Sequence, residues 1–303
     1  MTRPTLDVTR PTLRAIEGDS GHHQVSIVLP TYNRAAALRE NLGGFLAVDG
    51  VKEIVVVDDG SVDDTATVLA AHDEPRLRVV ALESNGGLPN ARNTGVDAAS
   101  GEWILFAEDD CRFPRDYALV LTREAQAHQA DIVGAPFIYP RDEADLPAAM
   151  ARERARPVRR VGMDSVKRFP PGPTQTPFMP ATALIRRTVF DVVRFDERYG
   201  GNAWREETAF FVEAARRGFA CLLTDATAAY QLDHYEGGAR GPRLNYEYWA
   251  LRNNWRFLRR HGGWLAEQGY LRSPSLAQLE LLGRRVHSVW AGWISTHVGR
   301  RAG

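Results

Sequence analysis

Two groups of acidic residues follow apolar runs in the first half of the chain. Asp58 and Asp59 close the run EIVVVDD, and Glu108, Asp109 and Asp110 follow the run WILFA. Carboxylates gathered at one sheet edge repel one another, and a cation or a hydrogen-bonded base and ribose would relieve that repulsion. Hard oxygen ligands on a rigid strand end suit Mg²⁺ or Mn²⁺, so Asp109 and Asp110 are the best metal candidates. The alternative is that these two acids only cap a helix or shape a turn.

A second acidic pair, Glu206 and Glu207, stands at the start of an expected helix over Arg205–Arg217. A helix N-terminus stabilises negative charge and lowers the pKa of a carboxyl group there. Partial burial beside Trp204 and Phe210 would have the opposite effect on the pKa. From the residues alone, two ordinary acids at a helix N-terminus are the favoured interpretation.

Four short apolar runs, rich in β-branched residues, must position the first-half acids. They begin about 25 residues apart, which leaves room for a helix between each pair. Continuous apolar runs of this length are typical of strands buried on both faces of a parallel sheet. The runs are Val25–Leu29, Glu53–Asp58, Arg78–Leu82 and Trp103–Ala107. The sequence therefore predicts an α/β fold whose ligands bind beyond the carboxyl ends of the strands.

Helices are expected between these runs, and a different pattern is expected after them. The second helix should be opened by a capping box at Ser61–Asp64. The proline-rich stretch Arg141–Thr176 is expected to be, in part, a long and mobile loop. The other expected elements are helices at Arg34–Ala47, Asn90–Ala99, Tyr246–His261 and Leu276–Val298, with a strand at Thr182–Arg187.

The composition is that of an ordinary globular protein. The chain has 303 residues, 44% of them hydrophobic and 25% charged, and no net charge at pH 7. This much apolar surface excludes disorder for the bulk of the chain. Two cysteines in a chain of this length exclude a disulfide scaffold. Cys111 and Cys221 also lack metal-binding spacing, which disfavours a zinc site. No run is long enough for a membrane-spanning helix and no signal-type stretch is present, so the expected compartment is the cytoplasm.

An ordered set of motifs carries a resemblance to a known family. PTYNR, VVVDDGSVDDT, SNGGLPNARNTGVDAASGEWILFAEDD and WREETAF, in this order, resemble the family 2 glycosyltransferases. The resemblance covers about residues 24–260. It implies the GT-A fold, a Rossmann-like and mostly parallel sheet flanked by helices. It also implies an inverting sugar transfer from a nucleoside-diphosphate sugar, aided by Mn²⁺ or Mg²⁺, with UDP- or dTDP-sugars as favoured donors.

The resemblance implies roles for individual residues around the nucleoside. Thr31 and Tyr32 would line the nucleobase pocket, and Asp59 would accept a hydrogen bond from the ring nitrogen of the base. Asp58 would support the turn that carries Asp59. Arg92, on the helix after the Gly-Gly turn, would contact the base or the diphosphate.

Further roles are implied at the diphosphate. Asp109 would meet the ribose and the metal, and Asp110 would ligate the metal. His234 would touch the metal or the diphosphate, and Arg240 would close over the diphosphate; a structural histidine and a solvated loop arginine are the alternatives. Many relatives have an acid where this chain has Ala107, so the implied metal geometry departs from the family pattern.

Transfer to a hydroxyl needs a base, because a neutral alcohol is a poor nucleophile. The family pattern places the base at Glu207, with Glu206 orienting the acceptor or the base. The acceptor would be a sugar, a lipid-linked glycan or a small molecule, and no nucleic-acid partner is expected. Three alternatives stay open: a retaining GT-A transferase, a nucleotidyltransferase on a similar sheet, and a non-catalytic nucleotide-binding or scaffold module. The nucleotidyltransferase is disfavoured, since the loop after the first strand is not glycine-rich.

The chain is expected to have three parts. An N-terminal tail covers residues 1–23, a GT-A catalytic domain covers 24–240, and a C-terminal helical extension covers 241–303. The donor half of the catalytic domain would be about 24–112 and the acceptor half about 113–240. From residue 237 to the end, eleven arginines face three glutamates. This basic extension suggests either peripheral contact with an anionic membrane or a homodimer interface.

Overall fold

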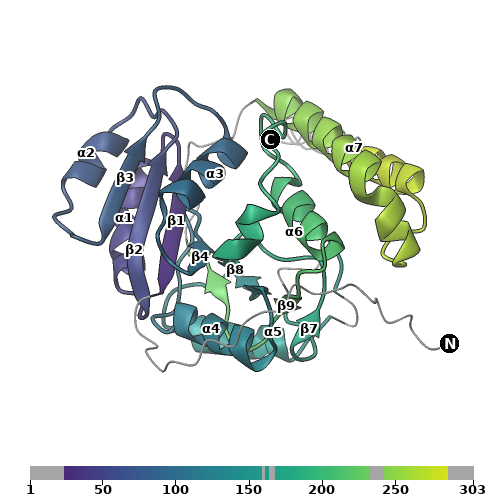
Figure 1. The fold of residues 1–303 in the computed structure, drawn as a ribbon, viewed down its shortest axis with the longest axis horizontal. Coiled ribbons are helices and arrows are strands. Elements are labelled where there is room, and N and C mark those ends of the chain that lie inside the picture. The colour runs from purple at the N-terminus through teal and green to yellow at the C-terminus, as the bar shows by residue number, and fades with distance from the viewer. Residues whose placement is uncertain (1–23, 159–160, 164–167, 233–241, 286–303) are drawn as a thin grey trace, which may run out of the picture.

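The computed structural model of the protein describes residues 24–158, 161–163, 168–232 and 242–285 (Figure 1). Its first half alternates strands with helices, as the spacing of the apolar runs predicts. The elements are β1 (Val25–Thr31), α1 (Ala35–Leu46), β2 (Val51–Asp58), α2 (Thr65–Ala70), β3 (Leu77–Ala81), α3 (Leu88–Ala98) and β4 (Trp103–Phe106). All four predicted strands and the three helices between them are confirmed, with boundaries shifted by a few residues.

The second half adds short strands and longer helices. Its elements are α4 (Tyr117–Ala127), β5 (Ile132–Gly134), β6 (Phe137–Ile138), α5 (Leu146–Arg154), β7 (Thr174–Gln175), β8 (Leu184–Arg186), the 3-10 helix η1 (Arg187–Asp191), α6 (Glu206–Arg216), β9 (Cys221–Leu223), β10 (Ala229–Tyr230) and α7 (Arg243–Glu267). Residues 274–285 are also helical. The predicted strand at 182–187 and the predicted helices at 205–217 and 246–261 are confirmed.

An eight-stranded mixed sheet forms the centre of the described structure, with the strand order β3-β2-β1-β4-β8-β5-β9-β7. Strands β1 to β4 pair in parallel, with Leu29 of β1 opposite Val56 of β2 and Val28 opposite Phe106 of β4. The short strand β8 runs antiparallel to both β4 and β5. The carboxyl ends of β1, β2 and β4 therefore meet at one edge, which brings the polar residues after them together.

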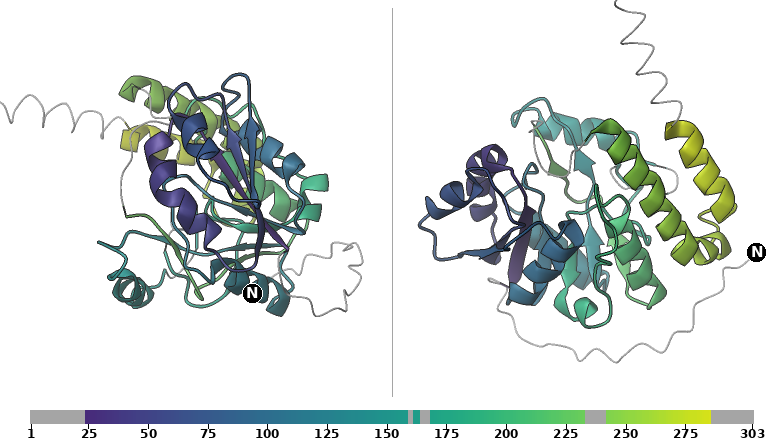
Figure 2. Two further views of the ribbon diagram at one scale, coloured as in Figure 1. Left: turned by 90° about the vertical axis from the view of Figure 1, so that its left-hand side faces the viewer. Right: turned by 90° about the horizontal axis from the view of Figure 1, so that it is seen from above.

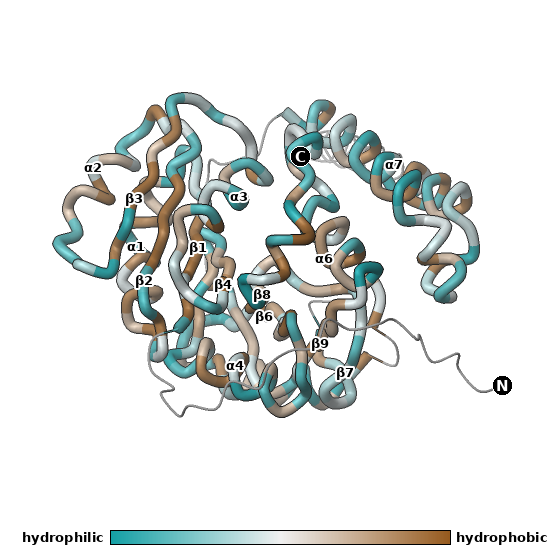
Figure 3. Tube along the Cα trace, in the orientation of Figure 1, coloured by the Kyte–Doolittle hydropathy of each residue, from teal (hydrophilic) through white to brown (hydrophobic). Residues whose placement is uncertain are grey.

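Helices cover both faces of this sheet (Figure 1). α1 and α4 pack on one face, where Leu29, Phe45 and Tyr117 are buried. α3 and α6 pack on the other face, where Val28 and Phe211 are buried. Figure 3 shows hydrophobic residues concentrated along β1 and β2. Burial on both faces explains why β1, β2 and β4 are nearly continuous apolar runs. The same expectation is wrong for the edge strand β3, whose residues are half-buried or exposed.

The proline-rich stretch 141–176 is not a loop throughout, because residues 146–154 form α5. Asp145 precedes this helix and forms ion pairs with Arg141 and Arg152, each with an Nη2–Oδ distance of 3.0 Å. The two guanidinium groups therefore pair with the single carboxylate of Asp145 at the start of the helix. The stretch is therefore a loop only in part, and its helix α5 was not predicted.

The predicted capping box is wrong, because the residue that precedes α2 is Asp64 and its side chain makes no capping hydrogen bond. Ser61 Oγ instead accepts a hydrogen bond from the backbone N–H of Asn33 at 2.8 Å. Asp63 Oδ1 accepts from the N–H of Thr65 at 3.1 Å. Ser61 therefore joins the turn after β2 to the turn after β1, a contact between segments that are distant in sequence.

The C-terminal helices lie side by side (Figure 2), which confirms the predicted helical extension. Arg285 Nη1 lies 3.3 Å from Glu247 Oε2, and Asn254 Nδ2 donates to Gln278 Oε1 at 2.7 Å. The predicted tail 1–23 and the end of the predicted last helix lie outside the described residues, and the domain boundaries stay a prediction. No helix in the described ranges combines the length and the hydropathy that crossing a membrane requires.

Candidate functional site

A cavity of about 770 Å³ lies beyond the carboxyl ends of β1, β2 and β4, between the two halves of the chain. Most of the donor-site residues predicted from the sequence lie on its wall. These are Thr31, Tyr32, Asp59, Arg92, Asp109 and Asp110. The structure therefore brings the carboxylates of two different strand ends into one cavity, as the prediction requires.

Asp58 and Asp59 take different places at the end of β2. Asp58 Oδ1 accepts a hydrogen bond from the N–H of Ser61 at 2.9 Å and so supports the turn. The two carboxylate oxygens of Asp59 accept from the N–H groups of Gly86 and Gly87 at 2.8 and 2.9 Å. Burial raises the pKa of Asp59, and these two hydrogen bonds oppose the rise. Each oxygen keeps a second lone pair, so Asp59 is still able to accept from a nucleobase.

Asp109 and Asp110 face a cation of the chain itself. Arg34 Nε lies 3.7 Å from Asp109 Oδ1, and Arg34 Nη2 lies 3.4 Å from Asp110 Oδ2. Thr31 Oγ1 donates a hydrogen bond to Asp109 Oδ2 at 2.9 Å. Burial raises the pKa of Asp109 to about 7; Arg34 opposes this rise, and Asp110 and Glu108 add to it. Arg34 ends the PTYNR motif, but its contact with the two aspartates is not predicted from the sequence.

The oxygen donors at this edge fit a divalent cation that is held partly by its substrate. Among the described residues, no group of three or more His, Cys, Asp or Glu side chains could hold a metal ion. Mg²⁺ usually takes only one or two carboxylates from a protein and completes its shell with water and phosphate. Asp109 and Asp110 supply that number. A cation beside them would relieve the repulsion that helps to raise the pKa of Asp109.

Two other predictions bear on the metal and the diphosphate. Ala107 lies on the cavity wall. Its methyl group offers no oxygen ligand at the position where the family pattern has an acid. His234 and Arg240 lie outside the described residues, so their predicted roles stay predictions.

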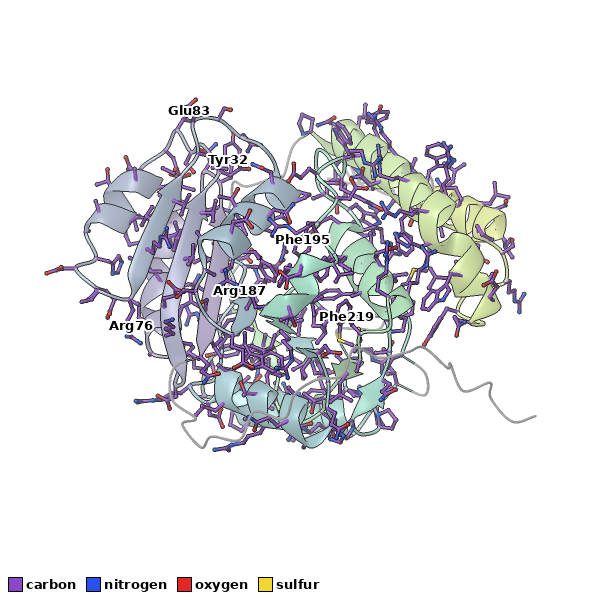
Figure 4. The ribbon with its side chains drawn as sticks, in the orientation of Figure 1. Tyr32, Arg76, Glu83, Arg187, Phe195 and Phe219 are labelled. Atoms are coloured by element: carbon purple, nitrogen blue, oxygen red, sulfur yellow. The ribbon has the colours of Figure 1, made fainter. Side chains whose placement is uncertain are left out.

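Arg92 and Glu206 form a buried ion pair that joins the two halves of the chain. Arg92 lies on α3 and Glu206 is the first residue of α6, with Nε and Oε1 3.0 Å apart. Both side chains are 1% exposed. The guanidinium lies over the rings of Phe106 and Phe195, and Figure 4 shows Phe195 in the space between the two helices. Burial raises the pKa of Glu206, and the charge of Arg92 opposes the rise.

This pair changes the interpretation of Glu206. Arg92 lies on the cavity wall, whereas Glu206 does not. Glu206 is therefore paired with a residue of the cavity wall and is not itself part of that wall, and its predicted role in orienting the acceptor or the base stays a prediction. The sequence contained no sign of the pair, because its members are separated by more than one hundred positions.

Glu207 follows a turn with unusual backbone geometry. Gly201, Ala203 and Arg205 have positive φ angles of 62°, 49° and 72°. Helix α7 helps to hold this turn, since Arg205 Nε donates to Asn254 Oδ1 at 3.3 Å. Gly201 lies on the cavity wall, but Glu207 is half-buried and does not. The role of Glu207 as the base therefore stays a prediction.

The second half of the chain supplies a wall that is not predicted from the sequence. Its residues are Tyr139, Gly201, Asn202, Gln231, Asn245, Tyr246 and Trp249. Five of these positions belong to α7 or to the turn that α7 holds. Aromatic residues at helical spacing usually indicate packing, so the pattern alone did not distinguish Trp249 from a core residue.

Comparison with known proteins places the chain in a family. The profile described as glycosyl transferase family 2 matches residues 26–194, which is more than half of the chain. The succinoglycan biosynthesis protein ExoO of Rhizobium meliloti is 38% identical over 109 residues, 36% of this chain and 31% of that protein. The uncharacterized glycosyltransferase YwdF of Bacillus subtilis is 27% identical over 195 residues, 64% of this chain and 68% of that protein. The aligned segments span a third or less of the first three curated relatives.

Solved structures agree on the fold. The mannosyltransferase PcManGT from Pyrobaculum calidifontis, in complex with GDP-Man and Mn²⁺, superposes with a TM-score of 0.60 at 18% identity, covering 91% of this chain and 76% of that one. TarS 1–349 of S. aureus, in complex with UDP-GlcNAc, gives a TM-score of 0.56 at 19% identity, covering 78% and 72%. These likenesses confirm the GT-A fold expected from the sequence. By its family match and its fold, the chain belongs to glycosyl transferase family 2.

Proposed function

We propose that this protein is a glycosyltransferase that moves a sugar from a nucleoside-diphosphate sugar to an acceptor hydroxyl. The observation that carries the proposal is the cavity at the sheet edge, where Asp59, Asp109 and Asp110 share one wall. Family membership supports the reaction class. Two structural neighbours, TarS in complex with UDP-GlcNAc and PcManGT in complex with GDP-Man, support a nucleotide sugar as the donor.

The donor would lie along the first-half wall of the cavity. Thr31 and Tyr32 would border the nucleobase, and Asp59 would accept a hydrogen bond from it, which suits uridine or thymidine. Arg92 lines the same wall, and its guanidinium lies against the rings of Phe106 and Phe195. An arginine fixed in this way can bind an anionic group of the donor without first losing side-chain freedom.

Asp109 and Asp110 would hold a divalent cation at the diphosphate end of the donor. Mn²⁺ or Mg²⁺, when bound, stabilises the negative charge of a departing nucleoside diphosphate. Arg34 contacts both carboxylates in this structure, so its guanidinium is also close to where that charge would develop. Thr31 fixes the orientation of Asp109 through its hydroxyl group.

The transfer itself would invert the anomeric carbon in a single in-line displacement. The acceptor oxygen forms a bond to the anomeric carbon while the bond from that carbon to the diphosphate oxygen breaks. The proton of the acceptor hydroxyl passes to a carboxylate, for which Glu207 is our candidate. Glu207 is half-buried and directly follows the turn that reaches the cavity, which supports this choice.

The proposal is tested by nucleotide release and by product stereochemistry. Purified protein is screened with UDP-, dTDP- and GDP-sugars, with and without Mn²⁺, and the anomeric configuration of any product is read by NMR. Glu207→Gln should reduce transfer by about 10²-fold or more while donor binding is retained, since a general base contributes on this scale. Glu267→Gln, an exposed acid at the end of α7, serves as the control.

A retained rate in Glu207→Gln would exclude Glu207 as the base and turn attention to Glu108, which lies on the cavity wall beside the metal pair. A product with the donor configuration would exclude the inverting mechanism. If no nucleotide sugar is consumed and none raises the melting temperature, the transferase proposal fails and a scaffold function is favoured.

We further propose that α7 contacts an anionic membrane surface. Leu244, Tyr248 and Trp255 are 77%, 54% and 53% exposed, and they lie on one stripe of the helix with the exposed Arg252 and Arg259. Apolar and aromatic side chains interleaved with arginines suit the headgroup region of a bilayer. Co-sedimentation with phosphatidylserine vesicles should be lost at high salt and in Trp255→Ala. Dimerisation without any vesicle binding would refute this and favour a subunit interface.

A further inference from the structure

The two walls of the cavity differ in charge. The first-half wall carries Arg34, Arg92, Glu108 and three aspartates. The described residues of the second-half wall are all uncharged, and they are amides, aromatic rings and a glycine. An anionic group of a substrate therefore finds its charged partners on one side only, and the opposite side of the described cavity is suited to a neutral group.

Helix α7 builds this uncharged wall by holding the turn at residues 200–202. Asn253 Nδ2 donates to the carbonyl of Gly200 at 2.9 Å, and Asn202 Nδ2 donates to the carbonyl of Tyr246 at 3.0 Å. The indole of Trp249 lies against Gly201 so closely that a Cβ on that glycine would be 2.2 Å from Trp249 Cγ. The positive φ of Gly201, 62°, also favours glycine there. The wall is thus fixed before any substrate arrives.

Two of its side chains are exposed as well as adjacent to the cavity. Tyr139 is 54% exposed, and Asn245 lies exposed in the first turn of α7. Tyr246 follows directly and is half-buried. An aromatic ring offers a flat surface to the C–H groups on one face of a pyranose, and an amide offers both a donor and an acceptor to its hydroxyls.

We propose that Tyr139, Asn245, Tyr246 and Trp249 form an acceptor subsite for the pyranose ring of a neutral saccharide. The inference rests on the proposed transferase function and names the acceptor class. A lipid phosphate as acceptor would need cationic side chains around its anionic head, and the described residues that line this wall carry none. Arg252 and Arg285 lie over the rings of Trp249 and Tyr246, but they are not among the residues that line the cavity. The reactive hydroxyl would then belong to a sugar ring seated opposite the donor.

Ligand-observed NMR tests this without relying on turnover. Saturation-transfer spectra are recorded for a panel of methyl pyranosides and for geranyl phosphate, each with the full chain and UDP. Removing one such contact, in Tyr139→Ala or Asn245→Ala, should weaken pyranoside binding about tenfold, the equivalent of about 1.4 kcal/mol. Leu279→Ala, an exposed apolar change in the helix at 274–285 away from the cavity, should leave it unchanged.

Three results would overturn the subsite: no pyranoside binds, binding survives in both variants, or geranyl phosphate binds and is lost in the same variants. Thermal unfolding with nucleotide sugars on the same samples tests the transferase proposal separately. Pyranoside binding that depends on Tyr139 and Asn245, without any stabilisation by a nucleotide sugar, would support the subsite and contradict the transfer. Stabilisation by a nucleotide sugar without pyranoside binding would support the transferase proposal and contradict the subsite.

Discussion

The buried pair between Arg92 and Glu206 provides the sharpest test of how the two halves of the chain are joined. We consider Glu206→Leu, Arg92→Met and the double variant, which keep the side-chain volumes similar. Each single change leaves one charge buried without its partner. The double change removes both charges and leaves apolar side chains beside Phe106 and Phe195.

The magnitude follows from the geometry of the pair. At the observed Nε–Oε1 distance of 3.0 Å, two unit charges attract by about 5 kcal/mol for an effective dielectric constant of about 20. Both side chains are 1% exposed, so an orphaned charge would have almost no access to water. Removing one partner of such a pair costs about 3–5 kcal/mol of folding free energy. Replacing both with apolar groups should cost much less than the sum of the single changes.

The assay is urea unfolding followed by both circular dichroism and tryptophan fluorescence. A loss of about 4 kcal/mol would lower the midpoint by roughly 1 M or more, since the urea dependence is about 1–3 kcal/mol per M for small proteins and grows with size. The double variant should show a coupling energy of about 2 kcal/mol or more. The reasoning is refuted if either single variant loses under about 1 kcal/mol, or if the double variant loses the full sum.

Three further predictions concern stability and donor binding. Gly201→Ala should cost about 2–4 kcal/mol of unfolding free energy, because the new Cβ meets Trp249 at 2.2 Å and the left-handed backbone disfavours alanine; Gly43→Ala, in α1 with open space around it, should be neutral or stabilising. Burial lowers the pKa of His261 to about 4, below its ordinary 6.5. Since only the unfolded chain takes up this proton between those values, stability should fall by up to about 3 kcal/mol from pH 6.5 to pH 4, measured by urea midpoints. Asp110→Asn should weaken Mn²⁺-dependent binding of the donor at least about tenfold by calorimetry, with metal-free nucleotide binding less affected.

The controls make each of these predictions refutable. Equal changes in unfolding free energy in Gly201→Ala and Gly43→Ala would show that Trp249 does not pack tightly against Gly201. A His261→Gln variant with an unchanged acid dependence of its midpoint would assign that dependence to other groups. Equal loss of nucleotide binding with and without Mn²⁺ in Asp110→Asn would contradict a role for this carboxylate as a metal ligand.

Much of the first half was predictable because its signals are local. Each strand is a continuous apolar run, and a parallel strand pair requires a helix-length connection, so spacing alone indicated the βαβ units. The polar residues directly after the strands had to gather at one edge, which is why Asp59, Asp109 and Asp110 share a cavity. The capping box failed because Ser61 bonds to Asn33, a partner that no local pattern shows.

The sequence by itself determined the layered α/β fold and the acidic edge of its sheet. Both follow from residues that are close together in the chain: the apolar runs that form the strands and the polar residues directly after them. Only the tertiary structure decided that Glu206 pairs with Arg92, that Arg34 faces the aspartates, and that α7 completes the cavity with an uncharged wall. These contacts join residues far apart in the chain. Their formation depends on how whole helices pack against one another. The types and spacing of side chains within one segment do not indicate that packing.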